Sequence, residues 1–100
     1  MIKISYKKKD NHINYVSIKG HSGYAEEGFD IVCASVSSIA ITTVNALIKL
    51  DVDSIVYKED DGFLEIEIIK FNDTIDVLIC NMISMLEELQ KQYKDYIEIK

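Results

Sequence analysis

The chain has 100 residues, 48% of them apolar, and no proline, which fits one domain spanning residues 1–100 around one hydrophobic core. A net charge of −6 and the absence of arginine argue against general nucleic-acid binding, which requires clustered basic residues. Two widely separated cysteines form no disulfide framework, and no signal pattern opens the sequence. We therefore expect a cytoplasmic protein with reduced thiols.

Alternating apolar and polar residues predict two strands at the start of the chain. The first spans residues 2–7 and the second residues 12–19, and the turn signal Asp10-Asn11 joins them. In the second strand the apolar phase slips between Tyr15 and Val16. This slip predicts a bulge or burial on both faces.

A helix is predicted over residues 30–50, with Asp30 as its N-cap and Lys49 in its last turn. Residues 31–48 carry no charge, and that length is enough to span a membrane. Six of these eighteen residues are Ser, Thr or Asn, so we expect a buried globular helix. It has two apolar stripes and needs two packing surfaces, namely the sheet and either another helix or another subunit.

The second half of the chain repeats the order of two strands and a helix. Residues 54–58 and 63–69 form a predicted hairpin whose turn requires a positive φ at Gly62. A helix over 73–92 and a strand over 96–99 follow. The order ββαββαβ predicts an α+β fold with two helices on one face of a mainly antiparallel sheet, containing a ferredoxin-like split βαβ core.

Three of the four glycines, one of the two histidines and one of the two cysteines lie within GHSGYAEEGFDIVCASVSS, residues 20–38. Cys33 follows the predicted start of the first helix, where unpaired amides and the helix dipole lower the pKa of a thiol. The glycine-containing segment before the helix allows His21 to fold back towards the sulfur. A Cys–His pair of this kind is the arrangement of nucleophilic thiol catalysis, with the amides of Cys33 and Ala34 as candidate oxyanion donors.

Each of these residues also has an ordinary structural interpretation. A cysteine near a helix start is often an apolar filler, and a lone histidine after a strand is often a surface residue. Asp30 and Ser37 are expected to bond to local backbone. A zinc site at His21, Asp30 and Cys33 lacks a fourth ligand, so we expect no metal.

Two further reactive residues are not assigned to the candidate site. Cys80, inside the second helix, is expected to be core or subsurface filler. His12 is expected to be solvated at the start of the second strand.

The segment from Gly20 to Ser38 resembles the signature of the ribosomal-processing cysteine protease Prp family. In that family a Gly-His-x-Gly-Tyr-Ala stretch leads to Gly-x-Asp-Ile-Val-Cys-Ala at a helix start. The motif covers about a fifth of this chain, and the element order and length also fit.

The resemblance implies that His21 and Cys33 are a catalytic dyad in a homodimeric endopeptidase. Its implied substrate is the N-terminal extension of the twenty-seventh large-subunit ribosomal protein. It also implies a mobile loop over the site, pivoting at Gly20, Gly23 and Gly28, and no metal or organic cofactor. Neither nucleic acid nor membrane is implied as a partner.

Two competing hypotheses remain open on the sequence. One is a non-catalytic ribosome-assembly or peptide-binding module that holds a peptide without cutting it. The other is a thiol redox sensor built on Cys33, although no resolving cysteine lies close in sequence. In the catalytic hypothesis Asp30 caps the helix or orients His21, and Ser37 supports the thiolate.

Overall fold

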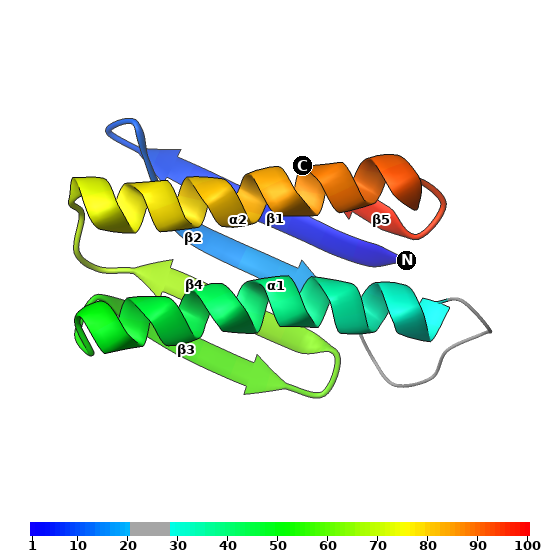
Figure 1. The fold of residues 1–100 in the computed structure, drawn as a ribbon, viewed down its shortest axis with the longest axis horizontal. Coiled ribbons are helices and arrows are strands. Elements are labelled where there is room, and N and C mark those ends of the chain that lie inside the picture. The colour runs from blue at the N-terminus through cyan, green and yellow to red at the C-terminus, as the bar shows by residue number, and fades with distance from the viewer. Residues whose placement is uncertain (21–28) are drawn as a thin grey trace.

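The computed structural model describes residues 1–20 and 29–100 and shows one sheet covered on one face by two helices (Figure 1). The observed elements confirm the order ββαββαβ. They are β1 (Ile2–Lys9), β2 (His12–Lys19), α1 (Phe29–Leu50), β3 (Ile55–Asp60), β4 (Phe63–Ile68), α2 (Asp73–Gln92) and β5 (Ile97–Ile99).

The five strands lie in the order β3-β4-β2-β1-β5. All neighbouring pairs are antiparallel except β1 and β5, which run parallel. The predicted α+β class is therefore confirmed. Within the split βαβ pattern, β1 is an additional strand inserted between β2 and β5, so that β5 pairs with β1.

The first hairpin contains the predicted irregularity. Its register shifts between Lys7 and Lys8, because Tyr15 pairs with Lys7 while Ile13 pairs with Lys8. Asn14 is thus the extra residue of a bulge, which moves the apolar phase of β2 from one face to the other. The predicted turn at Asp10 and Asn11 has φ of 52° and 66°, in the left-handed region that these residues tolerate.

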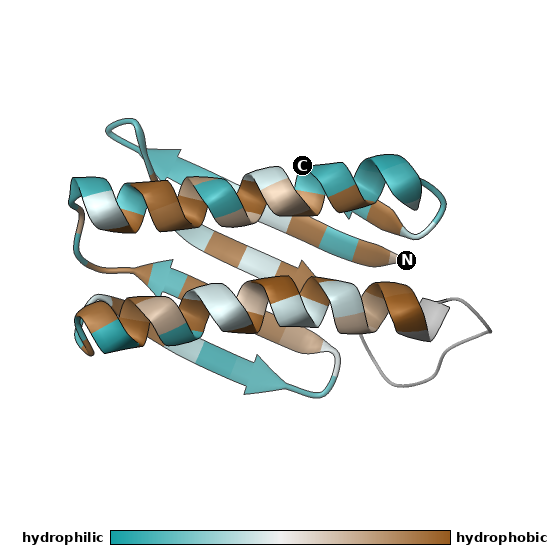
Figure 2. Cartoon of the chain, in the orientation of Figure 1, coloured by the Kyte–Doolittle hydropathy of each residue, from teal (hydrophilic) through white to brown (hydrophobic). Residues whose placement is uncertain are grey.

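The apolar side of α1 packs on the sheet as its periodicity predicts. Residues one turn apart along this side are buried: Val32, Val36, Ala40, Thr43, Val44 and Leu47. By length and hydropathy alone, Ile31–Leu50 would also qualify as a membrane span, a property that it shares with core helices. Figure 2 shows that brown and white dominate α1, whereas brown alternates with teal in α2.

Asp30 is not the cap that the sequence predicted. The helix begins at Phe29, so Asp30 lies in the first turn of α1. The prediction took the acidic residue before the apolar run as the cap, but Phe29 also adopts helical backbone. An acidic residue in the first turn still interacts favourably with the helix dipole.

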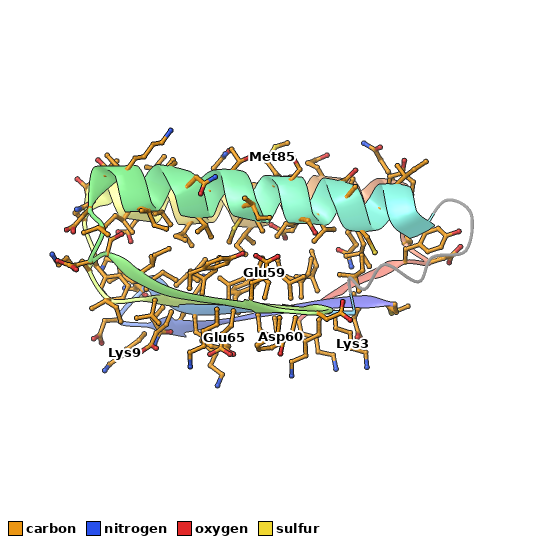
Figure 3. The ribbon with its side chains drawn as sticks, turned by 90° about the horizontal axis from the view of Figure 1, so that it is seen from below. Lys3, Lys9, Glu59, Asp60, Glu65 and Met85 are labelled. Carbon is orange, nitrogen blue, oxygen red and sulfur yellow. The ribbon has the colours of Figure 1, made fainter. Side chains whose placement is uncertain are left out.

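α2 begins and ends with ordinary helix signals. The side chain of its N-cap, Asn72, accepts a hydrogen bond from the amide of Ile75, and Asp73 and Asp76 lie in the first turn. Five buried side chains face the sheet: Ile75, Ile79, Met82, Ile83 and Leu86. The core therefore lies between the sheet and the two helices, and the opposite face of the sheet is polar (Figure 3).

Candidate functional site

Cys33 is the fifth residue of α1, in the second turn from its N-terminus. Its side chain is 8% exposed and belongs to the hydrophobic core. A thiol at this position lies near the positive end of the helix dipole, which favours the thiolate. Its burial works in the opposite direction, because an apolar surrounding disfavours charge.

The amides proposed as oxyanion donors lie inside the helix. In an α-helix that begins at Phe29, each amide from Cys33 onwards donates to the carbonyl four residues earlier. An oxyanion at the amides of Cys33 and Ala34 would therefore share these N–H groups with the helix. The amides that a helix leaves unpaired are those of its first turn.

Cys33 lies on the flank of α1 that faces away from α2. Ile39, Thr42 and Thr43 line a groove together with Met82 and Met85 of α2, so the second helix covers that side of α1. At 3.6 residues per turn, Cys33, Ser37 and Ile41 fall on the other flank. α2 therefore does not cover the second apolar stripe, although another helix was one of the two partners considered for it. This stripe consists of Cys33, Ser37, Ile41, Val44 and Ile48.

Ser37, one turn after Cys33, is partly buried on the same flank. This placement agrees with its candidate role beside the sulfur.

α1 contacts β3, whereas α2 contacts β2 and β5, so the Cys33 flank faces the β3 side of the molecule. Figure 1 shows this arrangement, with α1 above β3 and β4 and α2 above β1 and β2.

Gly20 fixes the point at which the chain leaves β2. Its φ is +89°, and a Cβ added there would lie 2.5 Å from the carbonyl oxygen of Met1. Its amide donates to the carbonyl of Gly62 over 2.9 Å. Only glycine tolerates both this positive φ and this close approach of the Met1 carbonyl. The hydrogen bond to Gly62 places the chain just before His21 beside the β3–β4 turn.

Three predicted site residues, His21, Gly23 and Gly28, lie outside the described residues, as does the side chain of Asp30. The structure brings the backbone preceding His21 and the start of α1 to the same end of the molecule (Figure 1). Contact between the imidazole and the sulfur remains a prediction.

Sequence reasoning missed a second polar cluster at the opposite end of the sheet. Nδ1 of His12 lies 2.9 Å from a carboxylate oxygen of Asp76, and its ring lies 4.8 Å from that of Phe71. His12 is therefore paired across 64 positions, which no local pattern indicates. Cys80 lines a small cavity with this pair and is exposed, contrary to the expected burial.

The sequence predicts Cys80 as core or subsurface filler because it lies between Ile79 and Asn81 in the second helix, but in the structure Ile79 is buried and Cys80 is exposed. One residue along a helix rotates the side chain by about 100°, which is enough to leave the core. Within residues 1–20 and 29–100, neither cysteine forms a disulfide and no group of three or more His, Cys, Asp or Glu side chains could hold a metal ion.

The fold and the position of Cys33 define an α+β domain with a thiol in the second turn of a helix, a suitable place for a nucleophile. A family model described as Cysteine protease Prp matches residues 1–98. The chain belongs to this family of cysteine proteases.

Relatives and solved structures agree with this assignment. The ribosomal processing cysteine protease Prp of Bacillus subtilis is 31% identical, over 90% of this chain and 87% of the relative. The protein of that name from Staphylococcus aureus is 28% identical, over 90% and 88%. A crystal structure of the S. aureus protease with a substrate peptide has a TM-score of 0.92 at 26% identity, covering 100% of this chain and 98% of that one.

Proposed function

We propose that this protein is a cytoplasmic endopeptidase that removes an N-terminal extension from the twenty-seventh protein of the large ribosomal subunit. Cys33 is the nucleophile and His21 is the general acid and base. The observation that carries the proposal is the burial of Cys33 in the second turn of α1, on the flank away from α2, within a family of cysteine proteases.

The reaction proceeds through a thioester. His21 takes the proton of the Cys33 thiol, and Sγ attacks the scissile carbonyl carbon. The C–N bond then breaks, and His21 returns the proton to the leaving amine. His21 then takes a proton from water, whose oxygen attacks the thioester carbonyl carbon. The C–S bond breaks, His21 returns the proton to the sulfur, and the amino-terminal fragment leaves with a free carboxyl group.

The relatives support the substrate class. The curated proteins carry the name ribosomal processing cysteine protease, and two S. aureus structures contain a substrate peptide and a covalently linked product peptide. The acidic net charge of this chain suits a basic ribosomal protein, because long-range attraction raises the rate of encounter.

A peptide that spans the extension junction tests the proposal. Wild-type protein is expected to cut it at one bond, whereas Cys33→Ala and His21→Ala are expected to be inactive. The matched control is Cys80→Ala, which removes the other thiol and should cleave at the wild-type rate. Cleavage that persists in Cys33→Ala would exclude the thiol mechanism, and binding without cleavage by any form would favour a peptide-binding module.

We also propose that the protein is a homodimer formed through the outer surface of its helices. The outward residues of α1 from Ile31 to Asn45 are uncharged, and Ile31 is 60% exposed. On α2, Val77 and Met85 are 66% and 47% exposed and lie two turns apart. The groove between the two helices is also lined by uncharged residues. An uncharged surface of this kind is typical of a self-association face.

A further inference from the structure

We propose that the free edge of β3 is the strand on which an extended peptide substrate pairs, with Glu59 receiving a basic side chain of that peptide. The inference rests on the proposed function and adds to it the position, the conformation and one side chain of the substrate. It assigns a substrate-binding role to a strand that is separate from the sequence motif.

β3 is an edge strand within the part of the chain that the structure describes. β3 is the first strand of the sheet and pairs with β4 from Ile55 to Asp60. Among the described residues, no strand pairs with its other side. Alternate residues of an edge strand direct their N–H and C=O groups outward, and an added peptide strand satisfies them with main-chain hydrogen bonds.

The same edge lies on the catalytic side of the molecule. Cys33 and Ser37 occupy the flank of α1 opposite α2, and it is α1 that contacts β3. β3 ends at Asp60, beside the Gly62 carbonyl that receives the amide of Gly20. A peptide strand running along β3 therefore approaches the end of the molecule that carries the second turn of α1 (Figure 1).

Glu59 is the charged residue that this edge directs towards the helices. Ile55 and Tyr57 share its face of β3 and pack in or against the core, because strand side chains alternate. Figure 3 shows Glu59 between sheet and helices, whereas Asp60 points to the opposite face. The hydroxyl of Tyr57 donates to the Glu59 carboxylate and holds it in place.

The charge at this edge is negative, which defines the chemistry of the occupant. Lys58 is followed by three consecutive acids, Glu59, Asp60 and Asp61, all exposed. Figure 2 shows β3 in teal over most of its length. Charged residues on an edge strand also discourage pairing with other chains, so the acids select a strand that carries complementary positive charge.

The first test measures pairing through the backbone. Cys33→Ala protein is titrated with fluorescent junction peptides, each N-methylated at one successive residue, and binding is followed by anisotropy. N-methylation removes one N–H donor, so an added strand predicts weakened binding at every second position. Uniform effects along the peptide, or no binding of the unmodified peptide, would overturn the inference.

The second test measures the charge. Glu59→Gln keeps the shape of the side chain and is expected to raise the dissociation constant of the junction peptide about two- to fivefold, as for an exposed ion pair. Glu59→Lys should raise it further and should prefer a peptide whose basic residue is changed to Glu. The matched control, Glu87→Gln on the exposed side of α2, removes the same charge and should bind as the parent protein does.

The two proposals fail separately in these experiments. If Cys33→Ala shows the alternating pattern but wild-type protein does not cut the peptide, β3 docking holds and the protease assignment fails. If wild-type protein cuts the peptide but the alternating pattern is missing, the protease assignment holds and β3 docking fails. Equal losses for Glu59→Gln and Glu87→Gln would attribute the effect to net charge and overturn the role of Glu59.

Discussion

Cys33 is the proposed nucleophile, yet its thiol is less exposed than that of Cys80. This thiol is 8% exposed, whereas Cys80 is exposed and lines a cavity with His12 and Asp76. Exposure alone would select Cys80 as the reactive residue. Position in the helix favours Cys33, because helical side chains point back towards the N-terminus and Cys33 lies one turn after the unpaired amides of α1, whereas Cys80 lies in the middle of α2.

Some of the polar and reactive residues could be predicted from the sequence, and others could not. Cys33 and Gly20 were found from local pattern, because a helix start and a chain reversal are both determined by neighbouring residues. The pairing of His12 with Asp76 was not found, since it joins the first hairpin to α2. The contact between His21 and Cys33 stays a prediction.

Gly20→Ala is expected to lower the free energy of unfolding by about 1–3 kcal/mol, the usual cost of placing a side chain in sparsely populated backbone. At a φ of +89° the new methyl group would also meet the carbonyl oxygen of Met1. Urea denaturation of the variant measures this loss. The neighbouring exposed substitution Lys19→Ala should change stability far less, and equal stability of Gly20→Ala and wild type would contradict the requirement for glycine.

At the scale of elements, α2 is stabilised mainly by its buried side. Met82 is fully buried, so Met82→Ala removes core contacts and is expected to cost about 2–5 kcal/mol. Glu87 lies on the exposed side of α2, and Glu87→Ala should stay within about 0.5 kcal/mol. Chemical denaturation of both variants checks the difference, and a similar cost at both positions would contradict the observed orientation of α2.

The loops after α1 and after β4 are joined by an ion pair between Asp51 and Lys70, with Nζ and Oδ2 2.9 Å apart. Lys70, and then the amide of Asp53, lower the pKa of Asp51, while Asp51 raises the pKa of Lys70. A carboxyl with a lowered pKa stabilises the fold above its ordinary pKa. That contribution disappears as the pH falls through the lowered value.

Asp51→Asn is therefore expected to be less stable than wild type at neutral pH, and the difference should shrink in acid. Urea titrations from about pH 7 down to about pH 2 measure this convergence. Because Lys70 has a raised pKa, the difference should also shrink above its ordinary value of 10.5. Asp95→Asn, at an exposed position without a described ion pair, serves as the control, and a difference that does not depend on pH would exclude this pair as its cause.

Most elements were predicted from periodicity, because one face of each strand and helix is buried. A phase slip in the second strand predicted a bulge or burial on both faces, and the structure has the bulge at Asn14. The turn at Gly62 was predicted from the glycine itself, and its φ of 72° confirms the positive φ. The predicted start of α1 lies one residue after the observed start at Phe29, because Asp30 is a favourable residue both at a cap and in the first turn. Such boundaries depend on the hydrogen bonds that the end residues make.

On the scale of the whole molecule, the order of the strands was not available from the sequence. β1 lies between β2 and β5, and β5 runs parallel to β1 although the two strands lie at opposite ends of the chain. Strand pairing over such separations depends on how the helices cover the sheet. The positions of the helices and strands along the chain, in contrast, depend on the local pattern of apolar and polar residues.

The uncharged outward side of α1 from Ile31 to Asn45, together with the groove between the two helices, predicts the state of association. Ser38 lies exposed on α1 and lines the groove between the two helices. Ser38→Lys would place one charge from each subunit in the proposed interface, where desolvation is unfavourable. Sedimentation at micromolar concentration should give a dimer for wild type and a monomer for this variant.

Asp95→Lys, in the turn between α2 and β5, introduces the same residue away from that surface and should leave the dimer intact. A wild-type monomer under these conditions would contradict the proposed interface. A Ser38→Lys protein that still sediments as a dimer would place the contact on another surface.

If Cys33 is the nucleophile, it carries the peptide as a thioester during turnover, and mass spectrometry can detect that adduct. Wild-type protein is mixed with the junction peptide, quenched in acid within the first turnover, and digested. We expect Cys33 to gain the mass of the amino-terminal peptide fragment, and we expect no such gain on Cys80 or in Cys33→Ala protein. Peptide cleavage by Cys33→Ala protein, which can form no adduct at position 33, would contradict this role of Cys33. An adduct on Cys80 would contradict it as well.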